Sequence, residues 1–333
     1  MGTLRLATRG SPLALRQTEL VSELLRQAHP GLNVEPLIVR TQGDRDVTSP
    51  LDQIGGQGVF VTEVEAAVAE GRAEAAVHSA KDMPSVMSAP FVLGAVPPRA
   101  DPRDGLVGAT LAGLPAGGLV ATGSARRRAQ LAALRPDLVF TDLRGNMARR
   151  VAMAEEGKVS AVVIAVAAME RLGWMDKVSD VLDPVAVLPQ AGQGAIAVQC
   201  RADDTGTREL LAAIDHAPSH RALRAERAVL AALGGNCTLP VGAFAEPDAT
   251  GPDVTGPDAT GPDATGPDAT GPDVTGATLR VSGLLASGDG HTVIRVTRRG
   301  QDPDAAGVAV ARALMDEGGA AIEGFGGLWD ATS

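Results

Sequence analysis

The chain has 333 residues, which is long enough for two or three domains because single hydrophobic cores rarely grow beyond about 250 residues. Hydrophobic residues make up 44% of the chain and charged residues 21%, the balance of a globular protein rather than a disordered or fibrous one. The net charge of -10, with 2% aromatic residues and no tyrosine, argues against a nucleic-acid partner.

No segment of the sequence is predicted to enter a membrane. The longest nearly apolar run, 161–169, is far shorter than the ~20 residues that span a bilayer. Arg5 and Arg9 lie around a short apolar segment that lacks the continuous apolar stretch of a secretory signal. The two cysteines, Cys200 and Cys237, are too few for a disulfide framework. We therefore expect a soluble cytoplasmic protein with no membrane partner.

The N-terminal part of the chain alternates short β-branched runs with helical stretches. Residues 4–8 and 75–78 are expected to be strands, and Ser11 is placed to cap a helix with Pro12 in its first turn. The pattern then recurs, with predicted strands at 119–122, 138–141 and 159–165 that lead into helices at 125–134, at 147–156 and up to Leu172. This alternation predicts an α/β protein whose parallel sheets are covered by helices.

The C-terminal part contains a short-period repeat. The unit PDATG or PDVTG occurs six times at 247–276, and its six aspartates supply more than half of the net charge of -10. Proline, aspartate and glycine favour turns, so we expect a flexible surface insertion rather than a short-period solenoid. Predicted strands at 277–285 and 292–297 and a helix at 305–316 follow. They indicate a small α+β domain with the repeat before its second strand.

Positive charge gathers between residues 121 and 150, where seven arginines and two aspartates leave a net +5 in an acidic chain. Residues 126–128 follow the expected cap Ser124, and Arg149 and Arg150 begin the next helix. The helix dipole disfavours a cation there by about 0.3–1 kcal/mol, which a bound carboxylate or phosphate would offset. A solvated basic face is the simpler interpretation of any single arginine, but five in two equivalent positions favour an anion site.

Several candidate side chains lie just past predicted strand ends, where ligands gather in open α/β sheets. They are Arg9, Lys81, Asp82, Arg126 and Arg144. Lys81 and Asp82 taken alone could be a surface ion pair.

The two cysteines lie in different surroundings. Cys237 is in a loop after two glycines, where its thiol should be accessible, whereas Cys200 lies in an apolar alternating run and should be buried. His78 is interpreted as a structural residue rather than a base. The spacing of cysteines and histidines predicts no metal site.

Seven sequence blocks follow one another along the chain. They are ATRGSPLA at 7–14, AVHSAKDMP at 76–84, GSARR at 123–127, LRGN at 143–146, AVAAMERLG at 165–173, LPQAGQGA at 188–195 and AERAVLAALGGNCTLPVG at 225–242. In this order they resemble the porphobilinogen deaminase family, also called hydroxymethylbilane synthases, over nearly the whole chain apart from the repeat.

The resemblance implies two lobes like those of periplasmic binding proteins and a small α+β C-terminal domain. Lobe 1 is expected at 1–98 and 194–213, lobe 2 at 99–193, and the C-terminal domain at 214–333, with the repeat inserted in it. A monomer is expected.

The resemblance also implies the chemistry. In this family a dipyrromethane cofactor is joined by a thioether to a loop cysteine, here Cys237, and four porphobilinogens add in turn with loss of ammonia. Water then releases hydroxymethylbilane, a linear tetrapyrrole of haem biosynthesis. Motif position implies Asp82 as the catalytic group. It implies Lys81, Ser79, Arg126, Arg127 and Arg144 for the cofactor, and Arg9, Arg150 and Arg171 for the substrate, because each pyrrole carries two carboxylates that need cationic partners.

This chain departs from the family pattern at four positions and in its repeat. Gln53 and Gln57 stand where many relatives have lysine, Gly123 where a second serine is common, and Asn236 where a small residue is usual. A non-catalytic two-lobed anion receptor is the main alternative function, but it leaves the Cys237 loop and Asp82 without a purpose. An RNA-binding protein that uses residues 121–150 is a weaker alternative, given the acidic chain.

Overall fold

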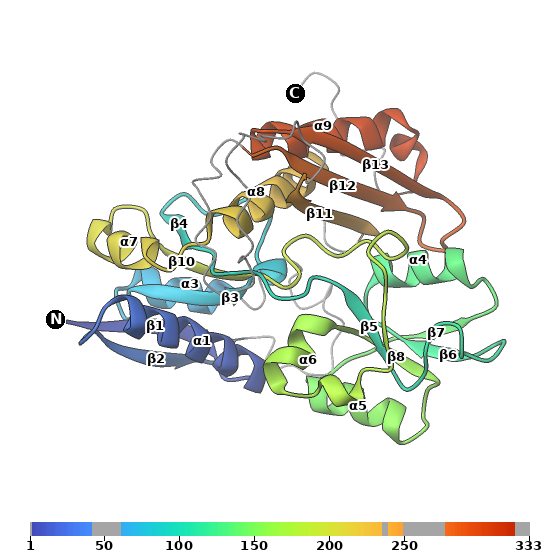
Figure 1. Ribbon diagram of the computed structural model, residues 1–333, viewed down its shortest axis with the longest axis horizontal. Coiled ribbons are helices and arrows are strands. Elements are labelled where there is room, and N and C mark those ends of the chain that lie inside the picture. Colours follow the sequence, from blue (N-terminus) through green and yellow to red (C-terminus); the bar gives the residue numbers. More distant parts are fainter. Residues whose placement is uncertain (1, 42–60, 235–238, 249–276, 324–333) are drawn as a thin grey trace, which may run out of the picture.

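The computed structural model describes residues 2–41, 61–234, 239–248 and 277–323. This part of the chain forms three sheets, which Figure 1 shows as two lobes side by side with a C-terminal domain above them. The predicted α/β fold of two lobes and a small C-terminal domain is confirmed. None of the helices in these ranges combines the length and the apolar character that a bilayer crossing needs.

Lobe 1 is built on a five-stranded sheet with the order β2-β1-β3-β10-β4. Its strands are β1 (Thr3–Arg9), β2 (Asn33–Val39), β3 (Ala75–Ser79), β4 (Phe91–Ala95) and β10 (Ile196–Arg201), and its helices are α1 (Pro12–Ala28), α3 (Thr62–Ala69) and α7 (Thr205–Ala212). As predicted, the Ser11 hydroxyl caps α1 by accepting from Ala14 N at 3.3 Å. Alternate residues of β1 face opposite sides, so that Leu6 packs with the α1 core and Ala7 with the α3 core.

Lobe 2 has a second five-stranded sheet, ordered β7-β6-β8-β5-β9. The strands are β5 (Asp104–Val107), β6 (Leu119–Ala121), β7 (Val139–Thr141), β8 (Ala161–Ala165) and β9 (Asp180–Val181), with helices α4 (Ala125–Leu134), α5 (Met147–Glu155) and α6 (Val166–Leu172). The predicted strand–loop–helix pattern is confirmed here, with caps at Ser124 and Asn146 that accept from the third helical N–H of α4 and α5.

The prediction of parallel sheets was wrong in one respect, because both lobes are mixed. In lobe 1, β10 runs antiparallel to β3 and β4, and in lobe 2, β5 runs antiparallel to β8 and β9. The register explains why: Asp104 at the start of β5 pairs with Ala165 at the end of β8, and Ile196 at the start of β10 pairs with Ser79 at the end of β3. Both reversed strands follow a crossing between the lobes, so they start at the edge where the parallel strands end.

The C-terminal domain is an antiparallel sheet of β11 (Val241–Pro247), β12 (Leu279–Ala286) and β13 (Val293–Gly300). Helices α8 (Ala217–Ala232) and α9 (Pro303–Asp316) share one apolar core with this sheet. Short 3-10 helices occur at η1 (Ala80–Asp82), η2 (Met175–Lys177) and η3 (Gly319–Ala321).

The repeat lies between β11 and β12, and nearly all of it is outside the described residues. Its first two residues, Pro247 and Asp248, are described, and they have defined partners in the sheet, which was not predicted for a flexible insertion. Pro247 ends β11, and the Asp248 carboxylate, whose side chain is 3% exposed, pairs with Arg299 of β13 at 2.6 Å.

Candidate functional site

The candidate site lies where strands of lobe 1 end and face lobe 2. A cavity of about 60 Å³ opens there, lined by Arg9 from the end of β1, Ser11 from the start of α1, and Ser79 and Asp82 from the end of β3. The structure therefore brings together three predicted site residues, Arg9, Ser79 and Asp82, around one cavity.

Buried contacts hold the end of β3 in place. Gln17 of α1 is buried and donates through Nε2 to the Ser79 hydroxyl at 3.0 Å. Gln190, on the segment that returns from lobe 2, donates to the Lys81 carbonyl at 3.2 Å. Gly192 on the same segment has a φ of +74°, and a Cβ there would lie 2.9 Å from Lys81 N. Only glycine permits this approach, which ties the crossing segment to the loop that carries Lys81 and Asp82.

The catalytic candidate Asp82 has an exposed side chain at the rim of the cavity. Lys81 beside it is only partly exposed. Burial and the charge of Arg127 lower the pKa of Lys81 to about 8, although Asp82 and Asp104 oppose this shift. A carboxylate bound beside the ammonium group would stabilise its charge and raise this pKa again, so anion binding and protonation of Lys81 favour each other.

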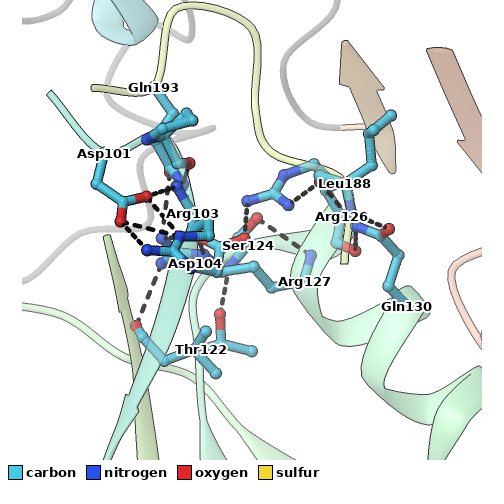
Figure 2. Close-up of polar contacts among 12 residues, drawn as sticks. Asp101, Arg103, Asp104, Thr122, Ser124, Arg126, Arg127, Gln130, Leu188 and Gln193 are labelled. Atoms are coloured by element: carbon cyan, nitrogen blue, oxygen red, sulfur yellow. Dashed lines mark hydrogen bonds and ion pairs between the residues drawn. The ribbon is translucent and has the colours of Figure 1, made fainter. Parts of the chain in front are cut away.

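The two arginines at the start of α4 share one buried carboxylate, that of Asp104 at the start of β5 (Figure 2). Arg126 Nη2 lies 2.8 Å from Asp104 Oδ2, and Arg127 Nη2 lies 2.6 Å from Asp104 Oδ1. Burial alone would raise the pKa of Asp104, but Arg126 and then Arg127 lower it to about 2. Asp104 therefore stays ionised at neutral pH.

The Arg126 guanidinium is almost completely buried but incompletely bonded. Its Nη1 donates to the Leu188 carbonyl, and burial lowers its pKa. Its Nε has no hydrogen-bond partner among the described residues, and the contact of Nη2 with Asp104 is an ion pair without hydrogen-bond alignment. A buried donor without an acceptor costs about 1–3 kcal/mol, so this group is suited to an additional anionic oxygen.

Arg150 and Arg171 are also partly buried cations of lobe 2. Burial lowers the pKa of Arg150, and Arg127 adds to this by charge repulsion, while Asp82 opposes it. Arg150 is thus close enough to the β3 loop for its charge to be felt there. Burial lowers the pKa of Arg171 to about 10, and its Nη2 donates to the Gly194 carbonyl on the crossing segment at 2.6 Å. Arg144 is half-buried in the loop before α5.

Some sequence predictions fall outside the described residues. Cys237 is among them, as are Gln53, Gln57 and Asn236. Gly123 is described, and a Cβ at this position would lie 2.9 Å from the Leu143 carbonyl oxygen, so a serine here would require a small shift of the loop before α5.

Two buried side chains of the site were not found from the sequence. Asp104 is the first residue of a short strand, and nothing in the sequence marks it as a partner of arginines 22 and 23 positions later. Gln193 donates through Nε2 to Asp104 Oδ1 at 2.9 Å and accepts from Arg127 Nη2 at 3.4 Å. Its place in the LPQAGQGA block was the only available signal.

His78 and Cys200 have the structural roles predicted for them. The buried His78 ring bonds to Gln199 Oε1 at 3.1 Å, and burial lowers its pKa to about 4, so the ring is neutral at pH 7. Cys200 is fully buried in β10, and burial raises its pKa to about 11. Within the described ranges, no group of three or more histidine, cysteine, aspartate or glutamate side chains is arranged to hold a metal ion.

Comparison with known proteins supplies the family. The family model described as "Porphobilinogen deaminase, dipyromethane cofactor binding domain" matches residues 4–209. A porphobilinogen deaminase of Roseiflexus sp. (strain RS-1) is 42% identical over 325 residues, which cover 96% of this chain and 98% of the relative. That of Xanthomonas euvesicatoria pv. vesicatoria (strain 85-10) is 42% identical over 327 residues, 97% of this chain and 99% of the relative.

Solved structures with two-lobed binding folds are more distant. The methionine binding protein MetQ aligns with 64% of this chain and 89% of its own length, with 10% identity and a TM-score of 0.38. The VFT2 domain of Bordetella pertussis BvgS covers 64% and 86%, with 19% identity and a TM-score of 0.34. These scores are too low to assign a function, so the assignment rests on the family model and the full-length relatives. The chain belongs to the porphobilinogen deaminase family.

Proposed function

We propose that this chain condenses four porphobilinogens head to tail onto a dipyrromethane attached to Cys237, with Asp82 as the catalytic group. The observation that supports this best is the position of Asp82 on a cavity shared with Arg9 and Ser79, with Lys81 and Arg150 near enough to interact with it electrostatically. Cations surround one carboxylate, as the condensation of polyanionic pyrroles requires.

The carboxylates of the cofactor and substrate are assigned to two groups of side chains. Those proposed for the cofactor are Lys81, Ser79, Arg126, Arg127 and Arg144, and those proposed for the substrate are Arg9, Arg150 and Arg171. The buried Nε of Arg126, which has no acceptor in the described part of the chain, fits a group rich in carboxylates. When attached, the dipyrromethane supplies the terminal pyrrole carbon to which the first substrate adds.

Asp82 acts on the aminomethyl group of each porphobilinogen. As the carbon–nitrogen bond breaks and ammonia leaves, positive charge develops on the pyrrole ring, and the Asp82 carboxylate stabilises it. Asp82 is also the proposed acceptor for the α-proton that would leave the terminal pyrrole ring once the new carbon–carbon bond has formed. Its exposed side chain on the cavity leaves the carboxylate accessible to incoming substrate.

The domain limits of this enzyme are proposed at 1–98 with 194–213, at 99–193 and at 214–333. The sheet membership supports them, since β10 joins the sheet of lobe 1 although it follows lobe 2 in the chain. The enzyme is proposed to act as a monomer. The small number of cysteines supports a cytoplasmic location.

The attachment of the cofactor is tested by intact-mass measurement under denaturing conditions. Freshly purified protein is expected to carry a covalent dipyrromethane on the Cys237 peptide, and Cys237→Ser should abolish this adduct. Cys200→Ser is the matched control, because the Cys200 thiol is buried and its raised pKa keeps it protonated. An unmodified Cys237 in active protein would contradict the proposal.

The pKa of Lys81 gives a test of the anion site. Because this pKa is about 8, the ammonium charge is present below pH 8 and is lost as the pH rises through that value. Each further pH unit lowers the charged fraction about tenfold, so the fraction of adduct-free chains that acquire the covalent dipyrromethane at one limiting porphobilinogen concentration should fall between pH 8 and 9.5. Lys81→Arg keeps its charge over this range, and its adduct fraction should stay nearly constant. Parallel pH profiles of the two proteins would show that Lys81 does not bind the cofactor.

A further inference from the structure

Asp104 stands apart from the other charged groups of the site, because it binds two cations and has no access to solvent. It is the first residue of β5, directly after the crossing from lobe 1, and its exposed fraction is 0%. Arg127 donates to its Oδ1 through both Nε, at 2.9 Å, and Nη2, at 2.6 Å. Two N–H groups of one guanidinium on one oxygen fix the direction of the Arg127 side chain.

The surroundings of Asp104 leave it little freedom to move. Gln193 donates to the same Oδ1 at 2.9 Å and is itself held by the Pro102 carbonyl at 2.7 Å. Arg127 Nη1 donates to the Val163 carbonyl at 3.2 Å, and Arg126 Nη1 to the Leu188 carbonyl. The carboxylate is thus anchored to the crossing segments on one side and orients the start of α4 on the other (Figure 2).

The charges of this cluster leave an excess for a ligand. Two guanidinium groups share one carboxylate, so one positive charge remains uncompensated within the cluster. Among the described residues, three buried polar atoms of this cluster have no hydrogen-bond partner: Arg126 Nε, Arg126 Nη2 and Asp104 Oδ2. Nη2 and Oδ2 face each other as an ion pair at 2.8 Å, which leaves Nε as the donor without an acceptor. An additional carboxylate would balance the charge and supply the missing acceptor.

We propose that Asp104 is a positioning residue, which orients Arg126 and Arg127 so that they receive a carboxylate of the dipyrromethane. This inference rests on the proposed function and deepens it, since it names the group that sets the arginines. Asp104 does not touch the ligand. Without its negative charge, two adjacent guanidinium groups would repel each other and leave the orientation in which they receive a carboxylate.

Asp104→Asn tests the proposal, since the amide keeps the size of the side chain and removes its charge. The full chain is produced in cells that make no porphobilinogen, so that it is purified without the adduct. It is then incubated with porphobilinogen over a range of concentrations, and the fraction of chains with the covalent adduct is counted by intact mass. We expect the half-saturating concentration to rise at least about tenfold, the size expected when a charge-assisted hydrogen bond is lost. A purely structural role would lower the melting temperature and leave this concentration unchanged.

Asp101→Asn is the matched control. Asp101 lies three residues before Asp104 in the chain and pairs with Arg103 at 2.5 Å. No described contact joins Asp101 to Arg126 or Arg127. Its half-saturating concentration should stay within about twofold of the wild type, as expected for an ion pair near the surface.

Gln193→Leu provides a second test if Asp104→Asn does not fold, because it removes a donor to Asp104 without changing any charge. Its half-saturating concentration should rise about threefold to tenfold. Wild-type behaviour of folded Asp104→Asn, or of Gln193→Leu, would overturn the positioning role. Absence of the adduct from the wild-type protein would instead refute the proposed function.

Discussion

Asp82→Asn is expected to lower the rate of ammonia release from porphobilinogen by about a thousandfold, counted per chain that carries the adduct. General acid–base catalysis contributes about 10²- to 10⁴-fold, and stabilisation of developing charge adds to it. The amide has nearly the shape of the carboxylate but neither its charge nor its basicity. Because the Asp82 side chain is exposed, the fold should be retained, with a circular dichroism spectrum and melting temperature like those of the wild type.

Asp203→Asn is the control for this experiment. Asp203 is also exposed in lobe 1, but it follows the end of β10, and the register of β10 with β3 puts it at the opposite edge of the sheet from Asp82. This variant should release ammonia at the wild-type rate. If Asp82→Asn did the same with a full complement of adduct, Asp82 would have no catalytic role.

Glu226→Gln is expected to cause the largest loss of stability among single changes at the junction of the three domains. Glu226 of α8 is fully buried and pairs with Arg99 at 2.5 Å, and Arg99 also donates to the Gln193 carbonyl at 2.8 Å. The two carboxylate oxygens of Glu226 also accept from Gly192 N at 2.6 Å and from Ala245 N at 2.8 Å. Removing one charge of a buried pair costs about 3–5 kcal/mol, because the other charge is left without a partner.

Urea denaturation measures this effect, with the slope of each transition compared between variants. Asp304→Asn is the matched control, because it breaks the pair between Arg224 of α8 and Asp304 of α9, in which both side chains are about half exposed. An exposed pair contributes about 0–1 kcal/mol. Equal losses for Glu226→Gln and Asp304→Asn would show that the buried pair does not hold the junction together.

Local sequence signals were sufficient for the elements that carry the site. The order Ser11–Pro12 predicts the start of α1 because a serine cap and a proline in the first turn are properties of a few adjacent residues. The same holds for Ser124 before α4, and hence for the place of Arg126. For α5 the sequence predicted the helix at 147–156 and thus the place of Arg150, and the structure adds Asn146 as its cap. The place of Asp82 just past a predicted strand end also agrees with the structure, which puts its side chain on the cavity shared with Arg9 and Ser79.

Strand direction and pairing across the junction required the tertiary structure. The antiparallel entry of β5 and β10 depends on where the chain crosses between lobes, and no local pattern encodes that direction. The partners of Arg126 and Arg127 were hidden for the same reason, since Asp104 reaches them only through the pairing of β5 with β8.

The sequence by itself determined the family, the catalytic candidate Asp82 and the attachment candidate Cys237, because these depend on residue type and on spacing within short motifs. Only the tertiary structure decided how the cations are held. It showed that Arg126 and Arg127 are buried against Asp104 rather than open to solvent, and that burial lowers the pKa of Lys81 to about 8. Burial and charge pairing are sums over neighbours that are distant in the sequence, which is why residue type alone cannot predict them.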